Sequence, residues 1–366
     1  MNVKRQCAVA FAAIAISAIA CTSGCATKSE AKNEARDEKT SPGNPKVVFE
    51  PNSSVLPEPG APSATNTPAP RDPFKQPRVT IKLPATTLGV AVRQIGETAK
   101  PSLVLMNGVE NKAIAARSFR NESLDKVAAS FAEETILKVQ RCPNYVFLYP
   151  PGYESLEAVS VSGKLGPTFD IGIQGMAFGS GLRLYTVFSW ISLALNVSIV
   201  ADDAIADARC GELVLGNVPL PDALEAILKS ARVVKYSVES TGEYVFVFTQ
   251  ENTSAPSQLL NEDALSEAQK AFLEKRINVF LPHQPEEGQT VEMALGPKTL
   301  GDILPSLSKQ LSITVVAEKG LEGLPVNPAV FRGVRVKTAL DLMIRQWLEP
   351  NYGYQLVQDR IVIRKR

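Results

Sequence analysis

One interval, repeated three times, most constrains what this chain can fold into. Two apolar sets at helical spacing occur in each of three stretches, and their leading residues lie 36 positions apart each time: Leu88 and Leu124, Leu184 and Leu220, Leu300 and Val336. Apolar steps of three and four residues place side chains on one face of a helix. Chance periodicity could give two helices in one stretch, but it would not give the same interval three times. The sequence therefore predicts a repeat that contains two amphipathic helices.

Short β-prone runs keep the same register in every stretch. One run follows each first helix and another ends each stretch: residues 102–104 and 146–148, 198–200 and 245–247, 314–316 and 361–363. Alternating apolar residues also open the first and third stretches, at residues 79–83 and 291–295, as expected of a strand with one buried face. In the second stretch the opening strand is placed at residues 169–174, and three glycines after it favour a bulge or a loop: Gly175, Gly179 and Gly181.

These elements together predict an α+β fold of three small β-α-β-β-α-β-β domains in tandem. Each would have about 75 residues, a size at which domains can still fold alone. We expect the domains to span residues 78–151, 168–250 and 289–366. Residues 251–288 would form a linker with a short amphipathic helix from 262 to 275, whose apolar face carries Leu265, Ala268 and Phe272.

The first 25 residues have the pattern of an export signal. Lys4 and Arg5 precede an apolar run from residue 8 to residue 20, which is shorter than the ~20 residues of a membrane-spanning helix. The sequence Gly24-Cys25-Ala26 that follows resembles a bacterial lipobox, in which a cysteine is lipidated and becomes the first mature residue. We therefore expect lipidation at Cys25, with Cys21 as the alternative and secretion without a lipid as the third possibility.

The residue after each candidate cysteine bears on the destination. Ala26 follows Cys25 and Thr22 follows Cys21, and neither is an aspartate. In lipoproteins that this segment resembles, such a residue implies delivery to the outer membrane. The expected location is thus the periplasm, with a lipid anchor in the outer membrane.

Residues 26–77 have the composition of a disordered tether. The segment begins charged and rich in alanine and continues rich in proline, so it cannot bury enough apolar surface to offset chain entropy. Fully extended, it could span on the order of 150 Å.

Two cysteines lie in the predicted domains, Cys142 and Cys210. In an oxidising periplasm two cysteines can form a disulfide. Their positions in the sequence do not place them within the few ångströms that such a bond requires, so pairing and free thiols both stay open.

Signals for catalysis are sparse. His283 is the one histidine and lies in a proline-flanked segment, and Asp202 and Asp203 are adjacent, as expected of a turn at a strand end. The sequence contains no nucleophile elbow, phosphate-binding loop or zinc-binding histidine motif. A net charge of +1 gives no signal for nucleic acid. We expect no enzyme activity, no cofactor, no metal and no small-molecule substrate.

The first helix of the second stretch differs from its counterparts. Opposite its core face it carries Leu182, Trp190 and Leu193, whereas the positions of the last two are Gln94 and Glu97 in the first stretch and Ser306 and Lys309 in the third. Two interpretations follow: this face packs against a neighbouring part of the chain, or it binds a partner protein.

Each stretch resembles the short N-terminal domain shared by secretins and TonB-dependent transducer receptors. The residues that carry the resemblance are the apolar patterns from Ile81 to Ile95 and from Leu124 to Phe131, and the second-helix patterns from Leu220 to Leu228 and from Val336 to Ile344. The resemblance implies two helices packed with two small mixed sheets. It also implies protein–protein contact in the periplasm.

The resemblance suggests two functions. The first is an accessory or scaffold lipoprotein of a secretin-type secretion or pilus machine, without the pore itself, because no pore segment precedes Arg366. Its expected partners are envelope proteins, such as a secretin or an inner-membrane secretion component. The second is a periplasmic signalling adaptor or a cell-wall-binding lipoprotein.

Overall fold

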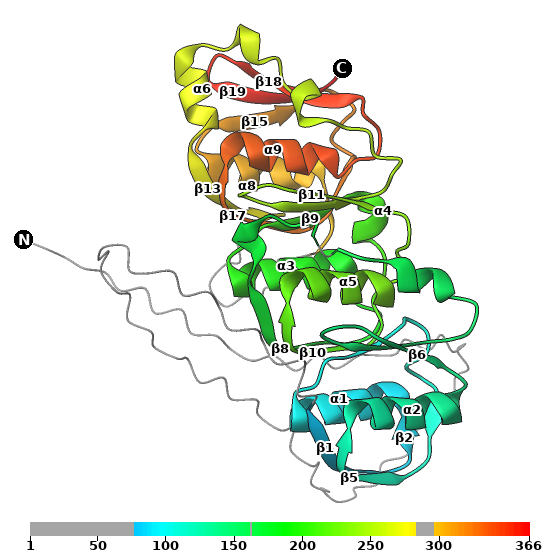
Figure 1. Cartoon of the computed structure of the whole chain (residues 1–366). Helices are drawn as coiled ribbons and strands as arrows, with labels where there is room; N and C mark the ends of the chain where they lie inside the picture. Colours follow the sequence, from blue (N-terminus) through cyan, green and yellow to red (C-terminus); the bar gives the residue numbers. More distant parts are fainter. Residues whose placement is uncertain (1–76, 162, 283–295) are drawn as a thin grey trace, which may run out of the picture. The chain divides into compact units, whose positions relative to one another are not determined.

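The computed structural model describes residues 77–161, 163–282 and 296–366 of the chain (Figure 1). This part has a mixed α+β fold in which helices pack with several small mixed sheets. The export signal, the candidate lipid-bearing Cys21 and Cys25, nearly all of the proposed tether, His283 and the strand expected at residues 291–295 lie outside the described residues.

Repeat one, residues 78–149, has two small sheets, a short two-residue pair and two helices. Its elements are β1 (Arg78–Leu83), β2 (Thr86–Thr87), α1 (Leu88–Ala99), β3 (Leu103–Leu105), β4 (Ala113–Ile114), β5 (Arg117–Ser123), α2 (Leu124–Thr135), β6 (Lys138–Arg141) and β7 (Val146–Tyr149). β1 pairs antiparallel with β5 and β2 with β4. β7 pairs parallel with β3 and antiparallel with β6.

Repeat two, residues 172–248, has the same pattern of long pairings. Its elements are β8 (Gly172–Phe178), α3 (Leu184–Leu195), β9 (Ile199–Ala201), α4 (Asp203–Ala206), β10 (Leu213–Pro219), α5 (Leu220–Ser230), β11 (Ser237–Ser240) and β12 (Val245–Phe248). β8 pairs antiparallel with β10, and β12 pairs parallel with β9 and antiparallel with β11.

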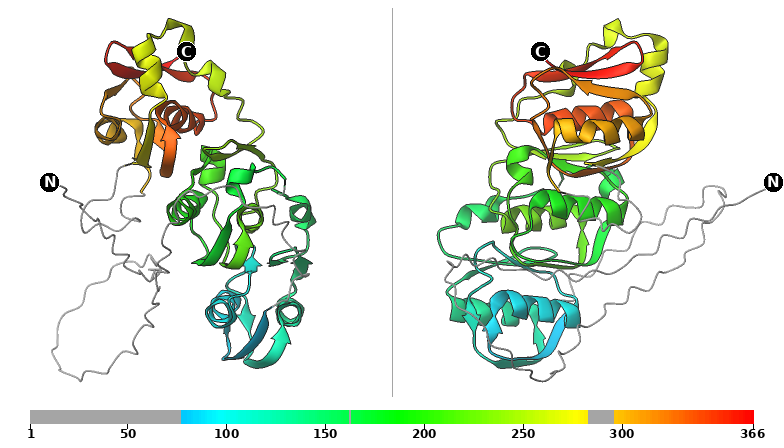
Figure 2. Two further views of the ribbon diagram at one scale, coloured as in Figure 1. Left: turned by 60° about the vertical axis from the view of Figure 1, so that its left-hand side comes forward. Right: turned by 180° about the vertical axis from the view of Figure 1, so that it is seen from behind.

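Repeat three, residues 276–365, has this pattern again. After α6 (Glu267–Leu273), its elements are β13 (Arg276–Leu281), β14 (Lys298–Thr299), α8 (Leu300–Leu311), β15 (Thr314–Ala317), β16 (Pro325–Val326), β17 (Ala329–Arg335), α9 (Val336–Arg345), β18 (Tyr352–Val357) and β19 (Arg360–Lys365). β13 pairs antiparallel with β17, and β19 pairs parallel with β15 and antiparallel with β18. Both views of Figure 2 show α8 and α9 side by side between these two sets of strands.

The helices begin where the apolar patterns begin, and local capping explains their bounds. Thr299 starts α8 with a capping box, in which its hydroxyl accepts from the Asp302 amide and the Asp302 carboxylate accepts from the Thr299 amide. At the other end, the first helix of each repeat stops at a residue in the left-handed region: Lys100, Asn196 and Ser312.

The opening strand of repeat three lies earlier than the sequence predicts. β13 occupies part of the stretch assigned to the linker, and it takes the place that β1 has in repeat one. The helix expected from 262 to 275 is correspondingly shorter, because α6 covers only Glu267–Leu273 and the chain turns into β13 directly after it. Similarly, the opening strand of repeat two is β8, a few residues later than expected.

A continuous sheet joins repeats one and two. β10 of repeat two pairs antiparallel with β3 of repeat one, which gives a five-stranded sheet in the order β6-β7-β3-β10-β8. The two backbones approach so closely at Gly216 that a Cβ atom there would lie 2.1 Å from the Lys100 carbonyl oxygen. Glycine is therefore required at this crossing. The side chains of both repeats share one hydrophobic core.

A second core belongs mainly to repeat three. Val200, Tyr244 and Phe246 of repeat two are buried in it together with side chains of repeat three, such as Phe331 and Leu340. Each pair of successive repeats is therefore joined by a buried, partly apolar interface.

Candidate protein interaction surfaces

The first interface joins the β6–β7 hairpin of repeat one to helix α5 of repeat two. Lys229 is 1% exposed, and its ammonium group donates to Glu225 Oε1 at 2.9 Å and to Gln140 Oε1 at 3.1 Å. The Tyr145 hydroxyl donates to Glu225 Oε1 at 2.7 Å, and the Asn144 amide donates to the Asp222 carboxylate. Pairing of this kind is what allows a buried charge to be tolerated.

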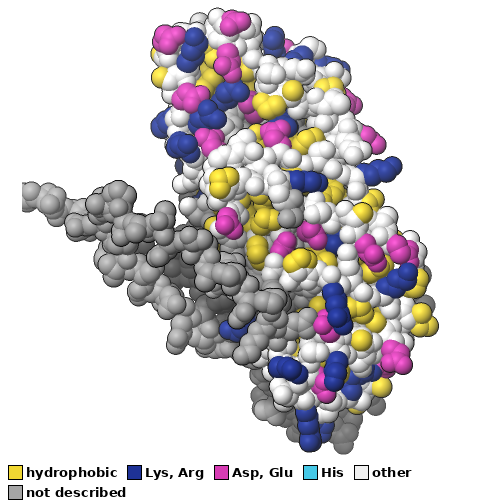
Figure 3. All heavy atoms as spheres, viewed as in Figure 1, with side chains coloured by type: hydrophobic (Ala, Val, Ile, Leu, Met, Phe, Trp, Pro, Cys, Tyr) yellow, Lys and Arg dark blue, Asp and Glu magenta, His cyan; other side chains and the backbone are white. Residues whose placement is uncertain are grey.

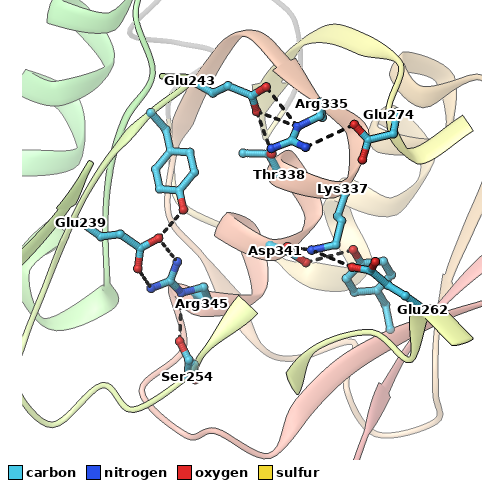
Figure 4. A network of polar contacts seen from close by, with 12 residues as sticks. Glu239, Glu243, Ser254, Glu262, Glu274, Arg335, Lys337, Thr338, Asp341 and Arg345 are labelled. Atoms are coloured by element: carbon cyan, nitrogen blue, oxygen red, sulfur yellow. Dashed lines mark hydrogen bonds and ion pairs between the residues drawn. The ribbon is translucent and has the colours of Figure 1, made fainter. Parts of the chain in front are cut away.

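The second interface joins the β11–β12 hairpin of repeat two to helix α9 of repeat three (Figure 4). The Arg345 guanidinium is almost fully buried and holds both oxygens of Glu239, at 2.9 and 2.7 Å. Its Nε donates to the Ser254 carbonyl at 3.0 Å. Glu243, in the hairpin turn, accepts from Thr338 at 2.9 Å and pairs with Arg335 at 3.1 Å.

The two interfaces use equivalent positions. When the repeats are aligned on their helix starts and strand registers, four contacts of the first interface have counterparts in the second. They are Gln140–Lys229 with Glu239–Arg345, Asn144–Asp222 with Glu243–Thr338, Ser102–Gly216 with Ser198–Arg332, and Asn107–Ser230 with Asp203–Gln346. One geometry of contact between neighbouring repeats is therefore used twice within the chain.

Each of the two hairpins carries a stacked pair of aromatic rings. Phe147 and Tyr149 of β7 stack with ring centroids 5.3 Å apart, and Phe246 and Phe248 of β12 stack at 5.2 Å. The Arg345 guanidinium carbon lies 4.4 Å from the centroid of the Phe246 ring. A cation over a desolvated ring is a favourable contact. Buried aromatic and arginine side chains are also the residues that dominate binding energy at protein interfaces.

Burial shifts the ionisation of several groups in these interfaces. It raises the pKa of the Tyr145 and Tyr244 hydroxyls above the ordinary value, and neighbouring carboxylates reinforce the effect. Burial would also raise the pKa of Glu239, but hydrogen bonds from Arg345 and Tyr244 outweigh it and hold this pKa below the usual value. Glu239 thus stays ionised at neutral pH.

The adjacent Asp202 and Asp203 lie at a strand end, as the sequence predicts, and differ in environment. Asp202 is fully buried and caps α4 by accepting from the Ile205 amide. Asp203 lies in the second interface and accepts from the Asn327 side chain at 2.7 Å. Burial, together with the charge of Asp202, raises the pKa of Asp203 to about 7.

The two cysteines of the predicted domains are both free thiols in this structure, so the disulfide is not formed. Cys142 is half-buried in the β6–β7 turn, where Lys229 approaches its sulfur to 3.6 Å. Cys210 is buried and its thiol donates to the Gly179 carbonyl. Burial raises the pKa of both thiols, to about 12 for Cys210, so neither is activated as a thiolate.

The apolar face of α3 is only partly covered. Trp190 and Leu193 lie on the helix, whereas Leu182, which the sequence placed on the same face, precedes the start of α3 at Leu184. All three are half-buried. Leu182 and Trp190 pack against the core shared by repeats one and two, whereas Leu193 belongs to neither core. Strand β17 of repeat three packs beside α3. Internal contacts therefore account for Leu182 and for part of Trp190, while Leu193 contributes to the surface.

Other features of the described residues carry no clear chemistry. No group of three or more His, Cys, Asp or Glu side chains in this part is placed to hold a metal ion. None of its helices is long and apolar enough to cross a membrane. A recess in repeat three has an entirely apolar lining that includes Leu307, Phe331 and Met343. Basic and acidic side chains are interspersed over the face shown in Figure 3.

Sequence reasoning missed the buried charges of both interfaces. A signal was present, because Glu225 and Lys229 in α5, and Asp341 and Arg345 in α9, are acid–base pairs four residues apart at matching positions of the two helices. The equivalent positions of α2 are Ala129 and Glu133, both exposed. A comparison of the repeats at these positions would have indicated that α5 and α9 are each packed against another element.

Comparisons with known proteins identify no family model, curated protein or solved structure that matches this chain. The fold and the two interfaces therefore define only a broad class, an α+β protein whose repeats bind one another through hairpin-to-helix contacts.

Proposed function

We propose that this chain is a lipid-anchored periplasmic adaptor that carries three secretin N-domain-like domains in tandem. It acts by protein–protein contact as an accessory or scaffold component of a secretin-type secretion or pilus machine. Its N-terminal lipid holds it in the outer membrane, and the proline-rich segment after the lipid gives the domains reach.

The observation that carries this proposal is the recurring pairing pattern of the repeats. In each repeat, the last strand pairs parallel with the strand that follows the first helix, and it pairs antiparallel with its own hairpin partner, the strand that follows the second helix. The opening strand of each repeat pairs antiparallel with the strand that leads into the second helix. The resemblance of the sequence to secretin N-domains implies this arrangement of two helices with two small sheets. Domains of that kind serve as docking modules.

The half-buried Leu193 offers a place to test the proposal. A photo-crosslinking amino acid at Leu193 of the full chain, expressed in its own cell envelope, should capture a secretin or an inner-membrane secretion component, identified by mass spectrometry. The same probe at Glu97, the equivalent exposed position of repeat one, serves as the matched control for nonspecific capture.

The captured proteins decide between the candidate functions. Crosslinks to a membrane regulator of transcription would contradict the secretion role and support a signalling adaptor. Recovery of peptidoglycan with the chain would support cell-wall binding instead. Identical capture from Leu193 and Glu97 would rule out the α3 face as the docking surface.

A further inference from the structure

Each interface within the chain joins the last hairpin of one repeat to the second helix of the next repeat. At the two ends of the series, one such hairpin and one such helix have no partner among the described repeats. Within the described residues, no later helix packs on the β18–β19 hairpin of repeat three, although Gln269 of α6 bonds the Leu356 and Gln358 carbonyls at the end of β18. Among the same residues, no earlier hairpin packs on α2 of repeat one. On α2, Lys126, Ala129 and Glu133 are exposed. Their counterparts in α9, Thr338, Asp341 and Arg345, are buried.

The end faces keep the polar framework of the interfaces. Thr314 of repeat three, which is exposed, places a hydroxyl where Ser102 and Ser198 bond the backbone of the next repeat. Gln355 takes the position of Gln140 and Glu239, which hold the cation of the next helix. The parts that would bond a following repeat are therefore present on repeat three.

The charges at the two ends are complementary at these positions. Asp359, in the β18–β19 turn, takes the place of Asn144 and Glu243 and would face Lys126 of α2. Arg364 takes the place of Tyr149 and Phe248, each of which belongs to the stacked ring pair of its hairpin. The centroid of the Phe248 ring lies 5.8 Å from the Arg345 guanidinium carbon, and α2 carries Glu133 at the position of Arg345. At the position of Lys229 and Arg345 the helix supplies the cation within the chain, whereas between the ends the helix would supply an anion, Glu133, at this position.

The same alignment places Lys319 of repeat three at the position of Asn107 and Asp203, whose backbone amides bond the carbonyl at the end of the next helix. The equivalent end of α2 is Glu134, whose carboxylate is already paired with Arg117 within repeat one. The pairs of opposite charge between the ends are therefore two: Asp359 with Lys126, and Arg364 with Glu133.

We propose that the chain associates head to tail with a second copy of itself, β18–β19 of one copy packing on α2 of the next. This self-association is independent of the function proposed above. The contact is heterologous, so it leaves a free face at each end and extends into open chains or closes as a ring. Val362 and Arg364 replace the stacked rings, so the association relies on charge and weakens as salt is raised.

Charge reversal and exchange test the contact directly in the purified full chain. In sedimentation velocity over a wide range of concentration, the wild-type chain should form species that grow with concentration. Glu133→Arg or Arg364→Glu alone should weaken this association by about tenfold or more, because each places like charges together. The double variant should restore association, because the pair is re-formed with its charges exchanged.

A second charge pair and a control variant distinguish loss of association from misfolding of a variant. Lys126→Glu, Asp359→Lys and their combination repeat the design at two exposed positions, where folding does not depend on the side chain. Lys309→Glu, on the exposed side of α8, is the matched control and should leave association unchanged. A wild-type chain that stays monomeric at every concentration, or association that is equal in all variants, would overturn the proposal.

Discussion

Buried cations are the residues on which the two interfaces depend. Lys229 and Arg345 are both almost fully buried, and each is hydrogen-bonded to a side chain of the preceding repeat, Gln140 and Glu239 respectively. A buried charge of this kind contributes little net stability while it is paired, but it is costly once its partner is removed. Replacing the residue that pairs with the buried cation should therefore destabilise the chain by more than the net contribution of the ion pair itself.

Glu239→Leu should destabilise the chain by about 2–3 kcal/mol in denaturant unfolding. Arg345 would lose its carboxylate inside the second interface, and the effect stays below the ~3–5 kcal/mol of a fully buried pair because Glu239 is 32% exposed. The double variant Glu239→Leu with Arg345→Met should recover most of the loss, because no unpaired charge remains. A double variant as unstable as the single one would show that the pair itself, rather than the stranded charge, dominates.

Asp203→Asn should change how stability depends on pH. The pKa of Asp203 is raised to about 7 in the folded chain, so the folded state binds this proton more tightly than the unfolded state does. The contribution of protonated Asp203 is complete below its ordinary pKa of 3.8 and is lost as pH rises towards 7. The difference in melting temperature between variant and wild type should therefore grow in the variant's favour from pH 4 to pH 7. A difference that is constant with pH would contradict the raised pKa.

Trp190→Ala should destabilise the chain by roughly 2 kcal/mol, less than the ~3–5 kcal/mol of a fully buried aromatic, because Trp190 is half-buried against the shared core. Leu193→Glu, which introduces the residue type of Glu97, should change stability by less than about 1 kcal/mol. Thermal melts of both variants measure this. If Trp190→Ala melted like the wild type, the side chain would have no internal role and would be free for a partner.

At the scale of elements, features determined within one repeat, such as helix bounds, could be predicted from the sequence. Features that depend on packing between two repeats could not. The helices α1, α3 and α8 start and stop at the apolar residues that the sequence indicates, because local periodicity and capping determine them. β13 was missed although Ile277, Val279 and Leu281 alternate, because a helical pattern runs directly into it. The buried charges were missed because only packing against a neighbouring repeat makes them buried.

The place of β13 gives a prediction about fragments. A fragment of residues 276–366 should unfold cooperatively, whereas residues 289–366, the boundaries expected from the sequence, should be much less stable. The shorter fragment lacks the strand that pairs with β17 and the buried side chains of Val279 and Leu281. Circular dichroism during urea unfolding of both fragments checks this. Equal stability would mean that residues 291–295 can replace β13.

At the scale of the whole molecule, one contact geometry adds repeats to one another in a fixed direction. Such proteins gain stability from each repeat and from each interface between neighbours. The end faces are then the natural points at which the series continues or stops. On α2, Lys126 and Glu133 are exposed, whereas the equivalent Thr338 and Arg345 of α9 are buried. On β19, Val362 and Arg364 take the place of the stacked aromatic rings of β7 and β12.

The proposed lipid anchor gives a prediction about where the chain is found. Cys25→Ala should move the chain from the outer-membrane fraction to the soluble periplasm, because it removes the residue that we propose is acylated, while Cys21→Ala should leave the chain membrane-bound. Mass spectrometry of the mature chain and fractionation of cells measure the two effects. If both variants remain membrane-bound with unaltered mass, the lipoprotein interpretation is wrong.

The different ways in which the two interfaces are joined have a mechanical consequence. Repeats one and two share backbone hydrogen bonds between β3 and β10, whereas β9 and β17, at the equivalent place between repeats two and three, are linked through the Ser198 hydroxyl. Under tension between the two ends of the chain, side-chain contacts separate one by one, while a continuous sheet must yield as a unit. Repeat three would therefore detach first and lengthen the chain while repeats one and two stayed folded together.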